Sequence, residues 1–343
     1  MPSPSNNPLA GWQVKREVIQ FIGHDLQRPE CILAEPGGSI WTADARGGAM
    51  HILPSGEQHL VTPVVERAGP GVSAFEDRYI QAQGSLPNGL AFTPSGDFII
   101  ANWGTNAIEI MSRSGNLRTL YTEVDGRPLG KTNFPLRDSK GRIYFTVTTR
   151  EHPWSDQINS RSHDGYIGLI DERGIRIVAE GFCGTNEIRF DDDEEWLYVV
   201  ESTARRISRL RALPDGSLTH REVYGPCVLD GHPDGFAFDS CGNLWVTLIF
   251  CDKLIAITPR GEVLTLLDDC NHEANALYEQ HYAAHTVSPE VLGANHGTLY
   301  PWMASLTFGG SDLTTVYLGS LRGTRIPYFR SPIAGQPMIH WRA

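Results

Sequence analysis

The sequence lacks several features that would assign it to a familiar class of protein. No apolar run approaches the roughly 20 residues needed to span a bilayer. The start, MPSPSNNPLAGW, lacks a charged segment followed by an apolar stretch. Positive charge is also scarce, since 29 Lys and Arg face 40 Asp and Glu, for a formal net charge of -11. We therefore expect no membrane span, no signal peptide, and neither nucleic acid nor a membrane surface as a partner.

Cysteine is sparse and shows no pattern. The six cysteines form no CxxC pair and no dense framework: Cys31, Cys183, Cys227, Cys241, Cys251 and Cys270. Free, buried thiols in a reducing cytoplasm are the plainest interpretation of such a set. The chain is therefore predicted to be cytoplasmic.

Three common signatures are also missing. No GxSxG nucleophile elbow occurs, so a serine hydrolase has no support. GRPLGKT (residues 126–132) resembles a phosphate-binding loop, but its glycines are one residue too close together and a strand is expected to follow. The GH…WD signature of WD-type propeller scaffolds is absent as well.

What the chain does contain is a repeat. Its 35 glycines and 22 prolines separate short apolar runs, which indicates many turns and an all-β fold. In four segments a polar residue lies eight positions before a glycine, which is followed by a polar residue and an apolar pair. A fifth segment, TNEIRFDDDEEWLY (residues 185–198), keeps the spacing but has an acid in place of the glycine. A looser sixth copy is SLTFGGSDLTTVYLGS, residues 305–320.

The repeat predicts a six-bladed β-propeller of four-stranded antiparallel blades. The five clear copies start 45 to 58 residues apart, which suits blades joined by loops of variable length. One such sheet cannot bury both faces alone, so we expect a single domain, residues 1–343, in which the blades surround a central channel. VKREVIQFI (Val14–Ile22) is predicted to be a strand that completes the last blade and closes the ring. A β-sandwich also has many short strands, but it does not explain the constant eight-residue spacing.

The polar residues of the repeat predict a central metal site. The first strand of each blade lines the channel, so the residues that open these strands converge at one end: Glu30, Asn88, Asn133, Asn186 and Asp234. Two carboxylates and several amide oxygens facing one axis need a positive charge between them, and hard divalent cations favour such oxygen ligands. Considered singly, a pair such as Asn88-Gly89 is more often only a turn former.

These segments resemble the SMP-30/gluconolactonase/luciferin-regenerating family of six-bladed propellers, over about residues 29–325. The most specific piece is TFGGSDLTTVYLGS (residues 307–320), which resembles the last-blade signature of the family. PDGFAFDSCGNLWV (residues 233–246) resembles the segment that carries the metal-binding aspartate of the family. GTNEIRFDDDEEWLYVVES (residues 184–202) resembles the segment that carries its metal-binding asparagine.

The resemblance implies an activity and a ligand set. Family members are typically lactonases that use one divalent cation. Carried over by position, Glu30, Asn186 and Asp234 would hold the metal, and Asn133 would lie near metal and substrate. Ca²⁺ is expected first, with Mg²⁺, Mn²⁺ and Zn²⁺ as alternatives.

Two departures from the family pattern fall close to the expected ligands. The usual Glu-Gly-Pro is Glu30-Cys31-Ile32 here, and the usual Asn-Gly is Asn186-Glu187. Both changes affect the backbone beside an expected ligand.

Hydrolysis at such a site would need a proton acceptor. A cation with open positions acts as a Lewis acid on an ester carbonyl and positions a water, whose proton must then be removed. Asp234 is the first candidate, although direct metal contact would lower its pKa and weaken it as a base. His152 is the best titratable alternative as a base or acid. The simpler hypothesis is that His152 is an ordinary loop histidine with no catalytic role.

The loops between second and third strands return to the channel mouth and should surround the metal. They provide aromatic and basic side chains: Trp103, Trp154 and Phe250 beside Arg46, Arg150 and His152. The residues expected to contact substrate are Asn88, Asn133, Trp103, Arg150 and Trp154. An aromatic lining favours a substrate larger or more apolar than a simple sugar lactone.

The segment from Asp268 to Trp302 interrupts the β pattern and is predicted to be a helical lid or insertion between blades. Ala274 to Ala284 reads as a short helix. His281 and His285 are spaced i, i+4, as in some metal sites, but no third ligand is evident, so a lid or surface helix is favoured. The long link from Val61 to Leu86 is expected to wrap the rim in a similar way.

Taken together, the residues predict a metal-dependent hydrolase that opens a lactone or a related cyclic ester, with a small molecule as its substrate. Two alternatives remain open. One is a metal-dependent isomerase or lyase acting on a carbonyl substrate. The other is a non-enzymatic calcium-binding or scaffold propeller.

Overall fold

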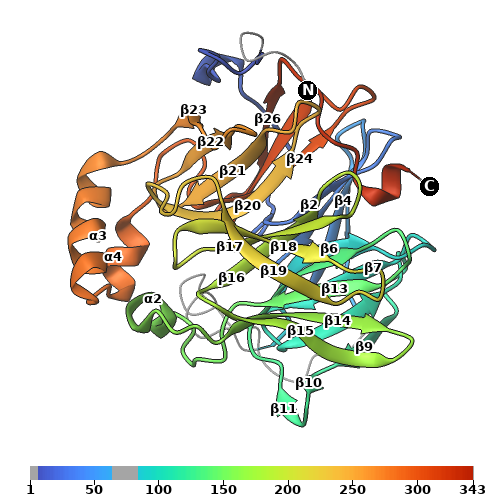
Figure 1. Cartoon of the computed structure of the whole chain (residues 1–343). Helices are drawn as coiled ribbons and strands as arrows, with labels where there is room; N and C mark the ends of the chain where they lie inside the picture. The colour runs from blue at the N-terminus through green and yellow to red at the C-terminus, as the bar shows by residue number, and fades with distance from the viewer. Residues whose placement is uncertain (1–6, 64–83, 343) are drawn as a thin grey trace.

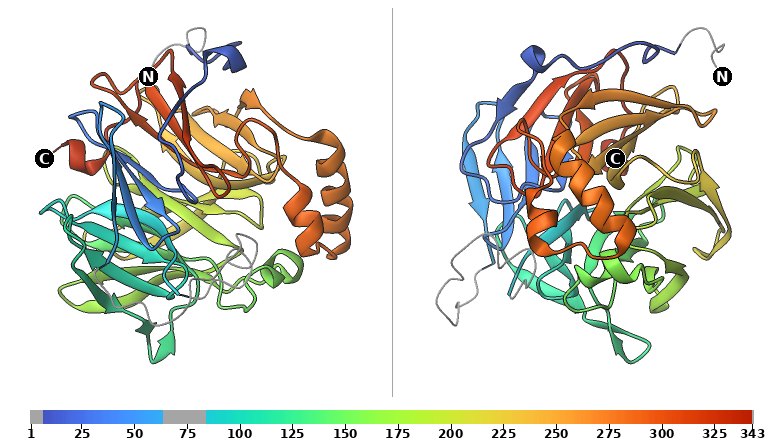
Figure 2. Two further views of the ribbon diagram at one scale, coloured as in Figure 1. Left: turned by 180° about the vertical axis from the view of Figure 1, so that it is seen from behind. Right: turned by 90° about the vertical axis from the view of Figure 1, so that its left-hand side faces the viewer.

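The chain forms a six-bladed propeller. The computed structural model describes residues 7–63 and 84–342 and arranges them in six four-stranded antiparallel sheets, together with the two-stranded hairpin β10 (Glu123–Val124) and β11 (Arg127–Pro128). The sheets lie around a common centre (Figure 1; right-hand view of Figure 2). The predicted all-β, six-bladed architecture is confirmed.

The first strand of every blade lies at the centre. This placement is shown by the contacts that these strands make with one another from blade to blade. The first three blades contain β2 (Ile32–Ala34), β3 (Ile40–Asp44), β4 (Gly48–Ile52) and β5 (Gln58–Val61); β6 (Pro87–Phe92), β7 (Phe98–Asn102), β8 (Ala107–Met111) and β9 (Leu117–Tyr121); and β12 (Thr132–Arg137), β13 (Ile143–Val147), β14 (Gly165–Asp171) and β15 (Gly174–Phe182).

The other three blades complete the ring. They contain β16 (Thr185–Phe190), β17 (Trp196–Glu201), β18 (Arg206–Ala212) and β19 (Leu218–Tyr224); β20 (His232–Phe238), β21 (Leu244–Ile249), β22 (Lys253–Ile257) and β23 (Val263–Asp268); and β24 (Met303–Gly309), β25 (Thr315–Ser320), β26 (Ile326–Arg330) and β1 (Gln20–Ile22).

The first and last strands of the described chain meet in the sixth blade. Strand β1 pairs antiparallel with β26, Gln20 opposite Tyr328 and Ile22 opposite Ile326. This pairing covers the edge of β26, which could otherwise pair with another chain. It confirms the predicted closure of the ring.

The predicted closing strand was too long. Only Gln20–Ile22 is a strand, and Arg16–Val18 forms a 3-10 turn. Further upstream, the backbone N–H of Val14 donates to the carbonyl of Leu266 in the fifth blade. The chain therefore crosses from one blade to the next, and residues 14–19 pair with no single strand in the described part of the chain.

The glycine of the repeat occupies a turn that needs a left-handed backbone. Gly38, Gly96, Gly141 and Gly242 have φ angles of 79° to 85°, a region that side chains with a Cβ seldom adopt. In the fourth blade Glu194 takes this position with φ 53°. The carboxylate of Asp191 supports that turn by accepting from the backbone N–H groups of Glu195 and Trp196.

A bulge recurs near the start of the inner strands. The register shifts in five of them, between Pro87 and Gly89, Thr132 and Pro135, Thr185 and Ile188, Pro233 and Phe236, and Met303 and Leu306. A bulge leaves a residue out of the ladder and re-aims its side chain. Four polar residues of the predicted ring lie inside these bulges: Asn88, Asn133, Asn186 and Asp234.

The helices collect on one face of the propeller. α2 (Asp156–Ser160), α3 (His272–Ala284) and α4 (Pro289–Ala294) lie together, while the 3-10 turn η3 (Ile339–Trp341) near the C-terminus lies on the opposite face (Figures 1 and 2). The helix predicted over residues 274–284 is present. Among the described residues, no helix is long and apolar enough to cross a membrane.

Helix α3 ends before His285, which adopts a left-handed conformation with φ 59°. Its ring Nδ1 lies 2.6 Å from the carbonyl oxygen of Asn159, whereas the ring of His281 contacts Thr286. The i, i+4 pair therefore has separate partners. The link from Val61 to Leu86 was also expected to wrap the rim. Its residues 64–83 lie outside the described residues, so this expectation stays a prediction.

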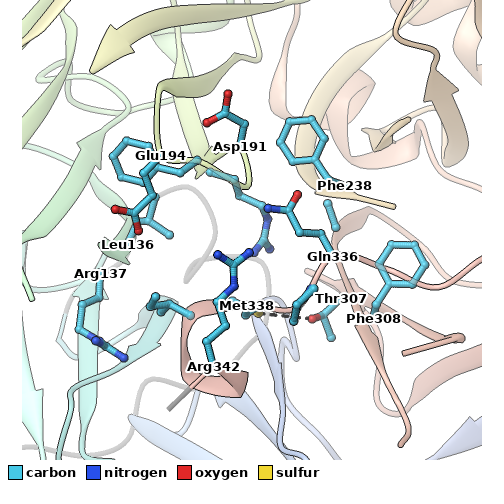
Figure 3. A pocket seen from close by; sticks show the side chains of 15 residues that line it. Leu136, Arg137, Asp191, Glu194, Phe238, Thr307, Phe308, Gln336, Met338 and Arg342 are labelled. Carbon is cyan, nitrogen blue, oxygen red and sulfur yellow. Dashed lines mark hydrogen bonds between the residues drawn. The ribbon is translucent and has the colours of Figure 1, made fainter. Parts of the chain in front are cut away.

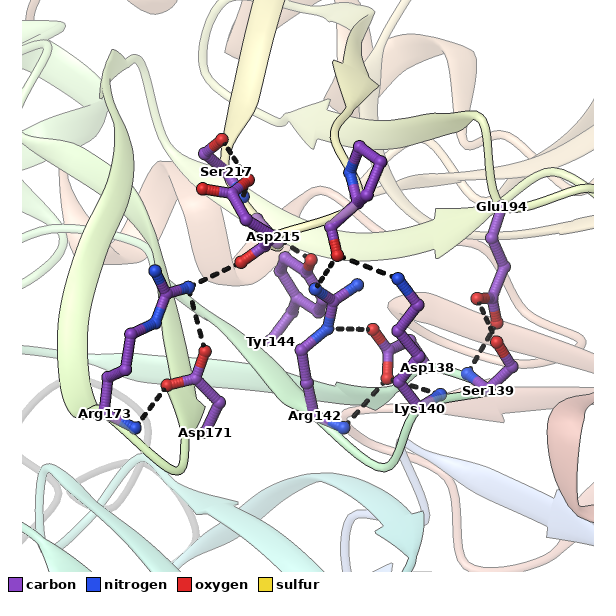
Figure 4. Close-up of polar contacts among 12 residues, drawn as sticks. Asp138, Ser139, Lys140, Arg142, Tyr144, Asp171, Arg173, Glu194, Asp215 and Ser217 are labelled. Carbon is purple, nitrogen blue, oxygen red and sulfur yellow. Dashed lines mark hydrogen bonds and ion pairs between the residues drawn. The ribbon is translucent and has the colours of Figure 1, made fainter.

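Polar contacts join the outer turns of the third and fourth blades (Figure 4). Arg142 forms a 2.6 Å ion pair with the buried Asp138 and also donates to the carbonyl of Pro214. Tyr144 donates its hydroxyl to the carbonyl of Gly216. These bonds tie the β12–β13 turn to the β18–β19 turn, in addition to the apolar contacts between blades.

Candidate functional site

The inner strands open into a pocket of about 700 Å³ on the face that carries the helices. All five residues of the predicted ring line it: Glu30, Asn88, Asn133, Asn186 and Asp234. Each of these residues is at most 8 % exposed. The structure therefore gathers at one place residues that are spread over more than 200 positions of the sequence.

The floor of this pocket contains acceptor oxygens without hydrogen-bond donors. Among the described residues, Asn133 Oδ1, Asn186 Oδ1 and Asp234 Oδ1 are buried and accept no hydrogen bond. Glu30 Oε2 accepts none either and is engaged by an ion pair. Buried polar atoms are usually satisfied, so several bare oxygens in one pocket need an electropositive partner.

An arginine that the sequence analysis did not identify lies beside Glu30. The guanidinium of Arg28 is 2.8 Å from Glu30 Oε2 and donates to Asn88 Oδ1 at 2.5 Å. Asn88 in turn donates to Glu30 Oε1 at 3.0 Å and to the carbonyl of Asn133 at 3.1 Å. These contacts fix the amide of Asn88 and the carboxylate of Glu30 in one orientation.

Burial makes the negative charges of this site costly. Desolvation, followed by the nearby carboxylates of Glu30 and Glu187, raises the pKa of Asp234 well above its usual range. Burial also raises the pKa of Glu30, which Arg28 and Asn88 partly offset. A bound cation would reverse this effect, because an opposite charge favours the ionised form.

Glu187 is a third carboxylate close to Asp234 and does not line the pocket. It is buried, accepts from the backbone N–H of Phe236 at 3.3 Å and lies 3.3 Å from the guanidinium of Arg189. Burial raises the pKa of Glu187 to about 7. The substitution of Glu187 for the glycine of the family pattern therefore adds an ionisable group behind Asp234.

The donor set fits a hard divalent cation. Two carboxylates and two bare amide oxygens are ligands that Ca²⁺ and Mg²⁺ prefer. No group of three or more His, Cys, Asp or Glu residues suited to a metal occurs in the described part of the chain. This site depends on asparagine oxygens for half of its donors, which suits oxygen-seeking cations better than sulfur- or nitrogen-seeking ones.

The wall of the pocket is largely apolar. Trp103 and Trp154 meet edge to face with ring centroids 5.6 Å apart, and Phe250 lies 5.3 Å from Trp302. The remaining apolar lining consists of Leu86, Ile158, Ile249 and Leu321. Ile158 belongs to α2, so the helical face supplies part of this wall.

His232 connects the pocket to helix α3. Its Nε2 lies 2.9 Å from the hydroxyl of Tyr278 and 3.0 Å from a guanidinium nitrogen of Arg205, and its Nδ1 lies 2.9 Å from the carbonyl of Ser202. The carbonyl can only accept, which assigns the ring proton to Nδ1. Burial, and next the charge of Arg205, lowers the pKa of His232 well below its ordinary value.

Arg205 also binds helix α3 directly. Both of its terminal nitrogens donate to the carboxylate of Glu279 at 2.8 Å, and its guanidinium lies over the ring of Tyr282 at 4.0 Å. The helix is thus attached to the fourth blade by charge and aromatic contacts, close to the pocket mouth.

Three residues expected at the mouth do not line the pocket. The guanidinium of Arg150 lies over the ring of Tyr166, 4.4 Å from its centroid, on the third blade. His152 is exposed on the loop before α2, and Arg46 is held by a bidentate pair with Asp44. The loop after β13 directs Trp154 toward the pocket, whereas Arg150 and His152 do not line it.

The sequence analysis missed the partners of the floor. Arg28, Gln157 and His232 line the pocket, and Glu187 lies behind it. Arg28 could have been predicted from the sequence, because a buried carboxylate such as Glu30 is usually paired with a nearby positive charge. His232 opens β20 two residues before Asp234, but its contact with α3 has no local signature.

The far ends of the inner strands form a separate pocket of about 650 Å³ (Figure 3). It is lined by Phe190, Phe238 and Phe308 at the ends of β16, β20 and β24, and by Met338 and Arg342 of the C-terminal segment. Arg342 pairs with Asp192. The C-terminal segment therefore covers the end of the channel opposite the pocket that contains Glu30, Asn186 and Asp234.

Fold and site together define a propeller with an acid- and amide-lined pocket at one end of its channel. Residues 28–269 match the SMP-30/Gluconolactonase/LRE-like region, and the chain belongs to this family. The family resemblance noted in the sequence is thereby confirmed, as is the β-propeller fold.

Individual relatives are distant. The chain is 27% identical to the protein strictosidine synthase-like 10 of Arabidopsis thaliana over 175 residues, 47% of this chain and 44% of the relative. It is 27% identical to lactonase drp35 of Staphylococcus saprophyticus over 169 residues, 48% of this chain and 47% of the relative. The matches thus span about half the length of these curated relatives.

The fold is shared with solved structures. A gluconolactonase from Xanthomonas campestris aligns with a TM-score of 0.64 at 16% identity, covering 92% of this chain and 89% of that one. The family includes lactonases, and all of these similarities to them are of low identity.

Proposed function

We propose that the protein hydrolyses a lactone or a related cyclic ester with the help of one divalent cation. The observation that supports this most strongly is the group of buried oxygens without donors on Asn133, Asn186 and Asp234, beside Glu30. Glu30, Asn186 and Asp234 are the proposed ligands. Bound there, the cation would act as a Lewis acid on the ester carbonyl.

The amides of the floor have a positioning role in this proposal. Asn88 holds Glu30 in place through its Nδ2 donor, and the bare Oδ1 of Asn133 faces the same pocket. Trp103 and Trp154 provide the surface against which the rest of the substrate lies. The apolar wall limits the access of bulk water to the ester.

Asp234 is the proposed proton acceptor, in addition to its proposed role as a ligand. Together with Glu30 it is one of two carboxylates that line this pocket in the described part of the chain, and Glu30 is engaged by Arg28. His232 is not suited to this role, because Nδ1 donates to a carbonyl and Nε2 is enclosed by Tyr278 and Arg205. His152, the other candidate, is exposed and does not line this pocket.

We further propose that α3 and α4 act as a lid. They lie on the face where the pocket opens, and α3 reaches the pocket through the Tyr278–His232 contact. A substrate would enter between this lid and the wall that contains Trp103 and Trp154.

The test is acid release from lactones in water labelled with ¹⁸O. Protein stripped with a chelator and reloaded with Ca²⁺, Mg²⁺, Mn²⁺ or Zn²⁺ should open at least one lactone and incorporate one solvent oxygen into the acid. Turnover of a carbonyl substrate without incorporation of label would identify an isomerase or lyase. Cation binding with no turnover of any substrate would identify a binding protein.

A further inference from the structure

We propose that the substrate carries an aromatic or branched hydrocarbon group on its ester ring and is not a polyhydroxylated sugar lactone. This inference rests on the proposed function and specifies its substrate class. It follows from the separation of the pocket into a polar floor and an apolar wall, and from the way the polar atoms of that wall are already used.

The apolar wall forms a continuous surface. Trp103 and Trp154 meet edge to face, and Ile158 of α2 extends the wall beside them. On the other side Phe250 is held by Trp302 and by Tyr278, with ring centroids 5.3 and 5.9 Å away. Rings held in this way form a fixed slot that suits a flat or branched apolar group.

Polar side chains of the wall are engaged within the protein. Thr148 donates its hydroxyl to the carbonyl of Thr185 at 2.7 Å, and Ser202 donates to the carbonyl of Pro233 at 2.6 Å. The amide of Gln157 bonds the hydroxyl of Thr203 and the carbonyl of Ser162. Both ring nitrogens of His232 are engaged, as described above.

Among the described residues, the buried acceptors of the pocket that lack a hydrogen-bond donor lie on the floor, on Asn133, Asn186 and Asp234, beside the ion-paired Glu30. A cation and the ester group would occupy them. A sugar lactone would place several hydroxyls against this largely apolar wall, whose polar side chains already bond within the protein, and each hydroxyl that loses its water without gaining a partner weakens binding by about tenfold. A hydrocarbon group loses nothing there and gains apolar contact.

The decisive comparison uses lactones of one ring size that differ only in the substituent. Unsubstituted δ-valerolactone, its phenyl- and isopropyl-substituted forms and glucono-δ-lactone are assayed for kcat/KM with the metal-loaded protein. We expect the phenyl-substituted lactone to exceed glucono-δ-lactone by at least 100-fold. A higher kcat/KM for glucono-δ-lactone would overturn the inference while leaving lactone hydrolysis intact.

A pair of tryptophan variants assigns the preference to the wall. Trp154→Ala should lower kcat/KM for the phenyl-substituted lactone about tenfold or more, chiefly through KM, and change that for unsubstituted δ-valerolactone less than threefold. Trp196→Ala, at the start of β17 and outside the pocket lining, is the matched control and should leave the ratio of the two substrates unchanged. An equal loss on both substrates for Trp154→Ala would contradict the proposed role.

A binding measurement separates this inference from the reaction itself. Cyclohexanone and 4-phenylcyclohexanone cannot be hydrolysed, and their dissociation constants are measured by calorimetry. We expect the phenyl form to bind at least tenfold more tightly and to lose this advantage in Trp154→Ala. If that holds and no lactone is opened, the proposed reaction fails and the inferred recognition stands. Equal binding of the two ketones would refute the recognition.

Discussion

Glu187 of the fourth blade fills the space beside Gly235 of the fifth, with its Oε1 2.6 Å from the point where a Cβ on Gly235 would lie. On the other side of Gly235 the backbone of the sixth blade is equally close, with Ser305 Cα at 2.6 Å and the carbonyl oxygen of Ala304 at 2.7 Å from the same point. The residue after Asp234 must therefore be glycine, because the neighbouring inner strands leave no room for a side chain.

Replacing Gly235 with alanine should destabilise the propeller. A Cβ there meets backbone that cannot rotate away, so we expect Gly235→Ala to lower the free energy of unfolding by about 1–3 kcal/mol. Gly37→Ala is the matched control, because a Cβ at Gly37 meets nothing within 4 Å. Urea unfolding of both variants measures the difference. Equal midpoints for the two variants would show that the inner strands do not approach as closely as described.

The polar contacts between the β12–β13 turn of the third blade and the β18–β19 turn of the fourth should contribute measurably to stability. Arg142→Met leaves the buried carboxylate of Asp138 without its ion-pair partner and removes a bond to Pro214, so a loss of about 1–3 kcal/mol in unfolding free energy is expected. Arg173→Met, which removes a more exposed pair with Asp171 in the same region (Figure 4), should cost less than about 1 kcal/mol. Thermal unfolding in which Arg173→Met is the more damaging change would contradict this account.

The attachment of α3 to the fourth blade should control the opening of that helix. Glu279→Gln weakens the two charged hydrogen bonds from Arg205, so the amides of α3 should exchange with deuterium about 5–30-fold faster than in the wild type, as a loss of 1–2 kcal/mol implies. Glu273→Gln, on the exposed first turn of α3, serves as the control and should change exchange only slightly. If both variants exchange alike, Arg205 does not anchor the helix.

His340 should make the C-terminal segment sensitive to acid. Its Nε2 donates to the carbonyl of Ala34, and burial lowers the pKa of His340 below its ordinary value. The unfolded chain then binds the proton more readily than the folded one, so the stabilisation is fully present above pH of about 6.5 and is lost as the pH falls below that value.

The check compares thermal unfolding of the wild type and His340→Gln at pH 8 and pH 5. The advantage of the wild type should shrink at pH 5, because only the wild type carries the proton-sensitive ring. His24→Gln, at an exposed histidine, controls for a general effect of removing an imidazole. An advantage that grows at pH 5 would mean that the histidine is stabilised by protonation.

The blades and the floor of the pocket could be predicted because their signals are local. A turn with a left-handed glycine and a polar residue eight positions earlier recur within each hairpin, so one pattern located Asn88, Asn133 and Asp234 together. The same spacing located Asn186, although Glu194 replaces the glycine of that repeat. Glu194 adopts the left-handed backbone that glycine adopts in the other repeats.

The remaining features depend on contacts between blades or on loop direction. Arg28 and Glu30 are close in sequence, but the carbonyl of Pro87 and the amide that complete the site of Arg28 come from the next blade. Arg150 and His152 lie on a loop without periodicity, so nothing in the sequence indicates which side chains face the channel. Residues 14–19 were predicted as strand because the sequence does not show that the pairing with β26 starts only at Gln20.

The central claim is that the buried oxygens of Glu30, Asn186 and Asp234 hold a divalent cation, and calorimetric titration of chelator-treated protein with Ca²⁺, Mg²⁺, Mn²⁺ and Zn²⁺ tests it most directly. We expect one cation to bind per chain, and the affinity to fall at least 100-fold in Asp234→Ala, with a parallel loss in Asn186→Ala. Asp239→Asn, which alters a buried carboxylate outside this pocket, should bind normally. Unchanged stoichiometry and affinity in Asp234→Ala would contradict the account.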